Sequence, residues 1–156
     1  MEIITATDKH VPEIMEIWKE YVDFHKDFDP RFPIRKEAAL NWEKYLRELM
    51  KVEDNQIVVA SDKGHVVGFS IATIRKYPPT IFERETDGFI SDMAVKTSYR
   101  RTGIGESMLG KIMEWFKSRQ IDRIVLSVSA GNQVGYPFWK KHGFKDYVHY
   151  LYLDLE

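Results

Sequence analysis

The segment Ile90-Ser91-Asp92-Met93-Ala94-Val95, followed by Tyr99-Arg100-Arg101-Thr102-Gly103-Ile104-Gly105, decides the fold of this 156-residue chain. Its first part predicts a strand from Gly88 to Val95, because it is short, apolar and preceded by turn residues. Its second part places two glycines in a turn. From about Ile104 to Arg119 apolar residues then recur at helical spacing, so we expect a strand, a glycine turn and a helix in direct succession.

The glycine turn has the properties of an anion site. Free backbone N–H groups at a helix start, with the positive end of the helix dipole, can hold a phosphate. Small residues at Gly103 and Gly105 would permit close approach, and Arg100 and Arg101 add positive charge. The same glycines could equally form only a tight connection, so the turn alone leaves both interpretations open.

Two familiar phosphate-binding motifs do not fit this turn. The dinucleotide fingerprint needs a third small residue, but Met108 occupies that position. A P-loop needs Gly-Lys followed by Ser or Thr, and that triplet occurs nowhere in the sequence.

Composition bounds the function classes. The chain is 44% hydrophobic and 30% charged, with a net charge of −1, which argues against a nucleic-acid-binding protein. It has no cysteine, so thiolate metal sites and a Cys-bound intermediate are excluded. The five histidines show no i,i+4 pair, and we expect no metal. No apolar run is long enough for a membrane span and no secretory signal is visible, so we expect a cytoplasmic protein without a membrane partner.

The rest of the chain predicts one domain over residues 1–156, with helices and strands in mixed order. Asp8 is the expected cap of the first helix. The predicted fold class is α/β, with a mixed sheet and helices on both faces. The expected strands are 2–6, 57–60, 66–72, 88–95, 123–129 and 147–155, and the expected helices are 11–22, 36–51, 104–119 and 134–141.

The central segment resembles the main motif of the GNAT superfamily of N-acetyltransferases, Arg/Gln-x-x-Gly-x-Gly/Ala after a strand ending in a Val-like residue. Three further matches extend the resemblance over essentially the whole chain in the family's order. These are Ile3-Ile4-Thr5-Ala6-Thr7-Asp8 at the start, Asn132 after the fifth strand, and Phe138-Trp139-Lys140-Lys141-His142-Gly143-Phe144 near the end.

The resemblance implies a GNAT-like fold with a mixed, mostly antiparallel sheet that splays between its fourth and fifth strands. Acetyl-CoA would enter that gap as co-substrate. The backbone of Met93, Ala94 and Val95 would pair with the pantetheine arm, which Asn132 would bond and Phe138 would contact. The implied pyrophosphate site comprises Arg100 at the edge, Arg101, Thr102, Gly103, Ile104, Gly105 and Glu106, with the Ser107 hydroxyl added.

The catalytic groups are less directly indicated. Asp92 is our preferred base, although a structural hydrogen bond at the strand splay would equally explain it. At the position where the family often has a proton-donating Tyr this chain has Trp139, and Ser127 replaces the Glu base of some members. Tyr136, one turn before Trp139, is a candidate substitute, with packing as its alternative. Tyr21, Phe24, His25 and Phe28 are candidates for the wall of an acceptor pocket beside the loop at 77–85.

These observations predict an N-acetyltransferase that moves an acetyl group from acetyl-CoA to a primary amine by direct attack, on a small molecule or a peptide. The alternative is a non-catalytic acyl-CoA-binding sensor, which the missing Tyr and Glu keep open. Homodimers are common among proteins of this fold, so a homodimer is a further candidate assembly.

Overall fold

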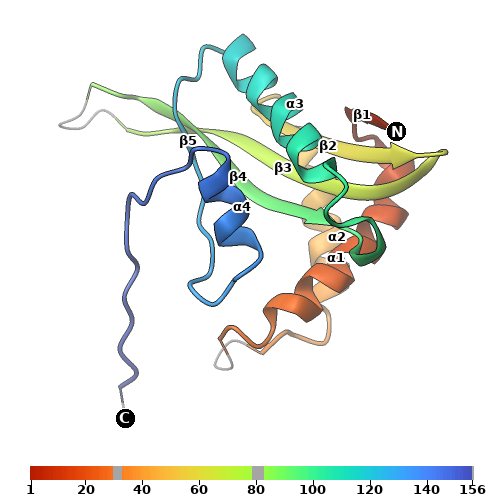
Figure 1. The fold of residues 1–156 in the computed structure, drawn as a ribbon, viewed down its shortest axis with the longest axis horizontal. Helices are drawn as coiled ribbons and strands as arrows, with labels where there is room; N and C mark the ends of the chain where they lie inside the picture. Colours follow the sequence, from red (N-terminus) through yellow and green to blue (C-terminus); the bar gives the residue numbers. More distant parts are fainter. Residues whose placement is uncertain (30–32, 79–82, 156) are drawn as a thin grey trace.

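The computed structural model describes residues 1–29, 33–78 and 83–155, and its centre is a five-stranded sheet in the order β1-β2-β3-β4-β5 (Figure 1). The strands are β1 (Glu2–Thr5), β2 (Asn55–Asp62), β3 (His65–Lys76), β4 (Thr86–Val95) and β5 (Ile124–Val125). The first four pair antiparallel and β4 pairs parallel with β5. The predicted mixed, mostly antiparallel sheet is therefore confirmed.

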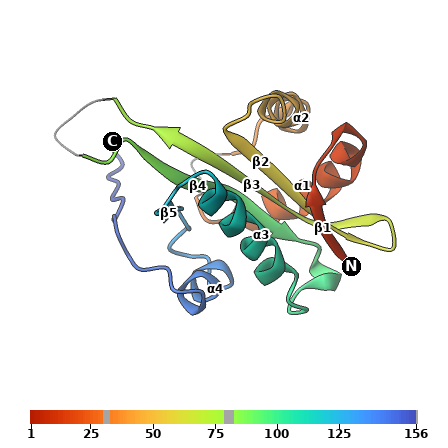
Figure 2. The same cartoon turned by 90° about the horizontal axis from the view of Figure 1, so that it is seen from above.

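Helices cover both faces of this sheet. Figure 2 shows α1 (Val11–His25) and α2 (Ala38–Leu49) on one side, and α3 (Ile104–Ser118) and α4 (Gly135–Lys141) on the other. Short 3₁₀ turns at Asp8–His10 and Thr97–Tyr99 precede α1 and α3.

Two apolar clusters hold the helices to the sheet. On the first face Phe69 and Ile71 of β3 pack with Ile14 and Trp18 of α1. On the second face Ala72 and Ile74 belong to a cluster with α3, because strand side chains alternate between faces. The α3 residues Met108, Leu109, Ile112 and Phe116 are each at most 2% exposed, and their spacing is what places one side of α3 on the sheet.

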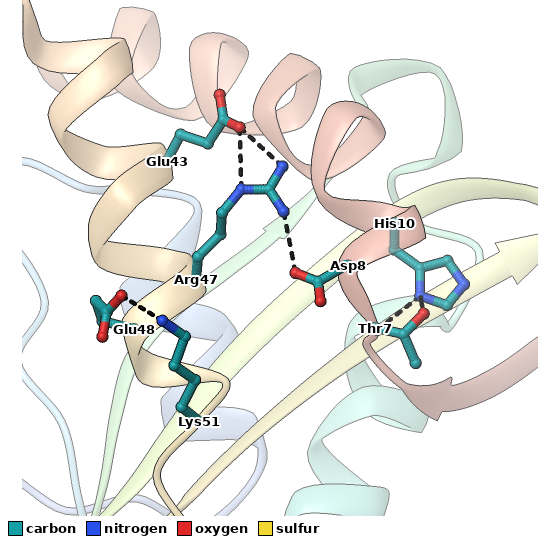
Figure 3. Close-up of polar contacts among 7 residues, drawn as sticks. All are labelled: Thr7, Asp8, His10, Glu43, Arg47, Glu48 and Lys51. Carbon is teal, nitrogen blue, oxygen red and sulfur yellow. Dashed lines mark hydrogen bonds and ion pairs between the residues drawn. The ribbon is translucent and has the colours of Figure 1, made fainter.

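The start of α1 differs from the sequence prediction. Thr7, not Asp8, precedes the 3₁₀ turn, and its backbone N–H donates to Nδ1 of His10 at 2.9 Å. The Asp8 carboxylate instead accepts from Arg47 of α2 at 3.0 Å, while Glu43 accepts from the same guanidinium at 2.9 Å (Figure 3). Asp8 therefore links this turn to α2 through an ion pair, because the Arg47 guanidinium lies within hydrogen-bonding distance.

Of the six predicted strands, one was too long and one does not form among the described residues. The strand expected at 123–129 is reduced to Ile124–Val125, because β4 and β5 separate after two paired positions. The segment 147–155 forms no strand in the structure and is exposed to solvent throughout. Residues 79–82 of the predicted loop at 77–85 lie outside the described residues, as do residues 30–32.

Candidate active site

The separation of β4 from β5 opens a cavity of about 870 Å³, a size suited to a small-molecule ligand. The two strands are paired only at Gly88–Ile124 and Phe89–Val125. Beyond these pairs, residues 90–95 line one wall of the cavity and residues 126–129 line the other. The sheet is thus open at the point where the sequence predicted a splay.

The glycine turn lies at one end of this cavity. Gly103 has φ +84° and is the N-cap of α3, a backbone conformation that side chains rarely adopt. The first intrahelical bond of this turn runs from Ser107 N–H to the Gly103 carbonyl at 3.0 Å, so the N–H groups of Ile104, Gly105 and Glu106 have no helical partner. These three residues line the cavity, which therefore meets the positive end of the α3 dipole.

The two arginines of the turn lie at the rim of the cavity. Arg101 has a positive φ of 61°, unusual for a residue with a side chain. Arg100 donates from Nε to the Val95 carbonyl at 3.3 Å, and its guanidinium lies 5.5 Å from the Phe24 ring centroid. Both residues are exposed, so the charge faces solvent at the cavity entrance.

Gly105 and Phe138 pack against each other at this end of the cavity. A Cβ at Gly105 would lie 3.3 Å from the Phe138 ring, so the position is small because Phe138 packs against it. His142 also lines the cavity, and its Nε2 is buried without a hydrogen-bond partner among the described residues. An unpaired buried nitrogen beside a cavity indicates a place for a ligand group. The residues present therefore fit an acyl-CoA at this position.

The backbone of β4 offers further polar groups. Lys96 N–H donates to the Val67 carbonyl of β3 at 2.9 Å. Bonded pairs alternate along antiparallel strands, so Ala94 also faces β3, whereas the N–H groups of Met93 and Val95 face the gap toward β5. Met93 and Val95 can therefore pair with an extended ligand as a neighbouring strand would.

Asp92 lies deeper in the cavity, at an irregular point of β4. Ile71 pairs with Asp92 and Ala72 pairs with Ile90, so Ser91 is an extra residue that forms a β-bulge. The Ser91 hydroxyl donates to the Asp92 carboxylate at 2.7 Å. Burial raises the pKa of Asp92 above its usual range, although the Ser91 bond and His25 oppose that shift. A carboxylate with a raised pKa in a cleft is a candidate proton acceptor.

Tyr21 and His25 of α1 line the cavity together with Asp92, as does Asn132 of the loop before α4. His25 Nδ1 lies 2.8 Å from the Tyr21 carbonyl, which can only accept, so Nδ1 carries the proton. His25 Nε2 then faces Nδ2 of Asn132 at 3.5 Å. Burial, together with the Asp92 charge, raises the pKa of Tyr21 to about 12. Tyr21 thus stays protonated near neutral pH and can donate a hydrogen bond.

Most of the predicted site residues lie in one place. Asp92, Tyr21, Phe24 and His25 line the cavity. The predicted cofactor residues that line it are Met93, Ala94, Val95, Arg100, Arg101, Gly103, Ile104, Gly105, Glu106, Asn132 and Phe138.

Four predicted residues lie outside the cavity lining. The Thr102 hydroxyl donates to the Tyr99 carbonyl at 2.6 Å, and the Ser107 hydroxyl donates to the Gly103 carbonyl at 3.1 Å. Tyr136 donates to Asp146 at 3.0 Å, so the substitute proton donor expected there is directed elsewhere. Phe28 contacts the side chains of Phe24 and His25 from behind.

Asn132 has a structural task that the sequence did not indicate. It is 8% exposed, and its Oδ1 accepts from the N–H groups of Val134 and Gly135 at 3.2 and 2.7 Å. It therefore holds the turn that begins α4 while its amide nitrogen faces His25. His142 is a candidate site residue that the sequence did not indicate, because its signal is an unpaired buried atom rather than a spacing.

Comparison with known proteins identifies the family of this chain. Residues 15–144 match the acetyltransferase (GNAT) family. The chain belongs to the GNAT acetyltransferases. An N-alpha-acetyltransferase of Sulfurisphaera tokodaii is 30% identical over 118 residues, covering 70% of this chain and 69% of that protein.

Two further acetyltransferases are similar to this chain. An uncharacterised N-acetyltransferase of Methanocaldococcus jannaschii is 28% identical over 92% of this chain, which spans only 60% of that relative's length. A predicted acetyltransferase from Clostridium acetobutylicum, solved with acetyl-CoA, superposes with a TM-score of 0.80 at 21% identity, over 98% of this chain and 95% of its own. The likeness at this identity establishes the GNAT fold.

No helix in the described residues is both long enough and apolar enough to cross a bilayer.

Proposed function

We propose that this GNAT protein transfers an acetyl group from acetyl-CoA to a primary amine of a small molecule or a peptide. The observation that carries the proposal is one cavity that is lined both by the start of α3 and by the half-buried Asp92. A thioester with a pyrophosphate needs the first, and an amine that must lose a proton needs the second.

The turn and β4 would hold the co-substrate. The N–H groups of Ile104, Gly105 and Glu106 would bond the pyrophosphate, with Arg100 and Arg101 adding charge at the entrance. The Met93 and Val95 backbone would align the pantetheine arm, which places the thioester near the bulge at Ser91 and Asp92.

In the reaction the Asp92 carboxylate accepts a proton from the acceptor ammonium, directly or through water. The freed amine nitrogen then attacks the thioester carbonyl carbon, so that a C–N bond forms and the C–S bond breaks. The coenzyme A thiolate leaves and takes up the second proton, which the attacking nitrogen loses as it becomes an amide. A backbone N–H of β4 would stabilise the negative oxygen, and Tyr21 is a protonated donor on the same side.

Direct attack needs no side-chain nucleophile, which agrees with a chain that has no cysteine. Asp87, an acid that could have attracted the amine, is 4% exposed and engaged by Arg75 at 2.8 Å and by Tyr77 at 2.8 Å. Glu83 and Glu85 are exposed near the same hairpin. Of the other acids that line the cavity, Glu20 accepts from Thr97 N–H at 3.1 Å and Glu106 lies in the first turn of α3, so Asp92 is our candidate base.

Thiol release from acetyl-CoA, measured with a panel of small amines and peptide N-termini, tests the proposal. We expect turnover with at least one amine class and a product mass increased by one acetyl group. Binding of acetyl-CoA with no turnover on any amine would instead favour the non-catalytic sensor.

A further inference from the structure

Acetyl transfer to an ammonium group removes two protons from the acceptor nitrogen, and Asp92 can hold only one of them. The first proton must leave before the nitrogen attacks, and the second leaves as the amide forms. Once the Asp92 carboxylate has taken the first proton it is neutral and no longer a base. A second base in the same cavity would carry the other proton to the departing sulfur.

His25, the last residue of α1, offers such a base to the cavity. Its Nδ1 lies 2.8 Å from the Tyr21 carbonyl, so in the neutral ring Nδ1 holds the proton and Nε2 carries a lone pair. The Asn132 amide nitrogen lies 3.5 Å from Nε2, which is long for a hydrogen bond. The lone pair of Nε2 is therefore available to a ligand.

Aromatic neighbours fix the orientation of the His25 ring. Its centroid lies 4.1 Å from that of Tyr21, and the rings of Phe24 and Phe28 meet it edge-on at 5.0 and 5.2 Å. The Phe28 ring also lies 3.3 Å from the position of a Cβ at Gly131. The end of α1 thus meets the loop before α4, although these two helices cover opposite sides of the sheet (Figure 2). A fixed ring is what proton transfer by a positioned side chain requires.

His25 and Asp92 are near enough to interact. Burial raises the pKa of Asp92, and both the Ser91 hydrogen bond and the electrostatic effect of His25 oppose that rise. Such an effect weakens with distance, so the imidazole and the carboxylate are neighbours. Both side chains line the cavity, as two groups that serve one acceptor nitrogen must.

The other acids and the tyrosine of this region are less suited to the second proton. Glu20 accepts from the N–H and the hydroxyl of Thr97, each at 3.1 Å. Glu106 lies in the first turn of α3, 3.9 Å from the Lys141 ammonium. Burial, together with the Asp92 charge, raises the pKa of Tyr21 to about 12, so its hydroxyl is already protonated and cannot serve as a base near neutral pH.

His142 is the other histidine that lines the cavity, but it lies beside the glycine turn. Its ring centroid is 4.5 Å from that of Phe138, and the same Phe138 ring lies 3.3 Å from the position of a Cβ at Gly105. His142 is therefore a neighbour of the proposed pyrophosphate site, and His25 is the histidine next to Asp92.

We propose that His25 is a second catalytic base, whose Nε2 takes the proton that the acceptor nitrogen loses as the amide forms and returns it to the coenzyme A sulfur. This role rests on the acetyl transfer proposed above. In the first transfer an N–H bond of the acceptor breaks and an Nε2–H bond forms, so His25 becomes an imidazolium.

In the second transfer the C–S bond breaks, the thiolate takes the proton from Nε2, and His25 returns to its neutral form. The proton count at His25 is therefore unchanged over one turnover, and no further reactant is needed. Imidazole suits this task, because it takes up and releases a proton near neutral pH.

His25→Asn tests the proposal, because the Asn amide can still donate to the Tyr21 carbonyl but has no base in place of Nε2. We expect kcat for an amine that the wild type acetylates to fall by at least about 100-fold. The affinity for acetyl-CoA, measured by titration calorimetry, should equal that of the wild type.

His10→Asn is the matched control. His10 is the N-cap of α1, outside the cavity lining, and its Nδ1 also bonds a neighbouring backbone group, the Thr7 N–H at 2.9 Å. This variant should keep the wild-type kcat. A wild-type kcat in His25→Asn would overturn the role of His25 and leave acetyl transfer intact, whereas a wild type that acetylates no amine would overturn both.

Chemical rescue separates proton transfer from a structural role. His25→Ala leaves space for an imidazole from solution, and the acetylated amine is quantified by mass because free imidazole itself cleaves thioesters. We expect the rate of amide formation to rise with imidazole concentration, and to rise more with more basic substituted imidazoles. His10→Ala should show no such response. A loss of activity in His25→Ala that no imidazole restores would show a structural role and overturn the proposal.

Discussion

At the residue scale, the position of Asp92 depends on the bulge that precedes it. Ser91 is the extra residue in β4, and Asp92 is half-buried and lines the cavity. Burial disfavours the charged form, which raises the pKa of the carboxyl group and makes its ionised form a stronger base.

Asp92→Asn should lower kcat by about 100-fold, because a positioned base contributes at least that factor. The wild-type rate should fall as pH drops through the raised pKa of Asp92, and the variant should lack that limb. Steady-state thiol release across the pH range measures both. Asp23→Asn on the exposed side of α1, where Asp23 pairs with Lys26, is the control and should behave as wild type.

The same substitution should change stability in a pH-dependent way. A raised pKa means that the folded state binds the Asp92 proton more tightly than the unfolded state. Its contribution to stability is present below the unfolded value of about 3.9 and is lost as pH rises through the folded value. Asn cannot ionise, so the unfolding free energy of Asp92→Asn relative to wild type should increase between about pH 4 and pH 7. A constant difference in urea unfolding would contradict the burial of this charge.

At the element scale, β4 and α3 pack closely at the point where β4 begins to separate from β5. A Cβ at Gly88 would lie 2.6 Å from the ring of Phe116, which is fully buried in the core. Gly88 is also one of the two β4 residues paired with β5, so this contact lies at the origin of the splay.

Gly88→Ala should destabilise the protein by about 1–3 kcal/mol, because the Phe116 ring cannot move away without cost. Gly110→Ala is the matched control within α3, where a Cβ meets nothing within 4 Å. That control should stabilise by roughly 0.5–1 kcal/mol, because alanine favours a helix. Urea denaturation of both variants gives the comparison, and equal stabilities would refute the close contact.

Elements with a clear period could be predicted from the sequence, and those that depend on a partner could not. The stripe of Met108, Leu109, Ile112 and Phe116 predicted α3 correctly, and Gly103 marked its start. Periodicity does not say where two strands separate, so the strand at 123–129 was predicted too long. The strand expected at 147–155 has the right composition but no partner within the described chain.

In the candidate site, too, features that depend on local sequence could be predicted and features that depend on a distant partner could not. The sequence motif predicted that the turn and Asp92 lie together, and both line the cavity, because their positions depend on local backbone. The motif did not indicate that the Tyr136 hydroxyl donates to Asp146, ten residues later. It also missed His142, because only the folded cavity shows that Nε2 lacks a partner.

At the scale of the whole molecule, the cavity links stability to ligand concentration. The melting temperature of the wild type should rise with the concentration of acetyl-CoA, because a ligand that binds only the folded chain stabilises it by mass action. Gly105→Glu, which adds a charge to the cavity lining, should show a smaller rise. Calorimetric scans over a hundredfold range of acetyl-CoA concentration compare the two, and equal rises would argue against binding at the start of α3.

The central claim is that the turn from Arg100 to Gly105, at the open end of the β4–β5 gap, binds the pyrophosphate of acetyl-CoA. Titration calorimetry of acetyl-CoA with Gly105→Glu and Gly110→Glu tests it most directly. Both variants add the same charge to α3, but only position 105 lines the cavity, and only there would a Cβ meet another residue, the Phe138 ring at 3.3 Å. We predict that Gly105→Glu weakens binding by at least about 100-fold, or about 2.7 kcal/mol, while Gly110→Glu binds as wild type. Equal affinities for the two variants would contradict the account.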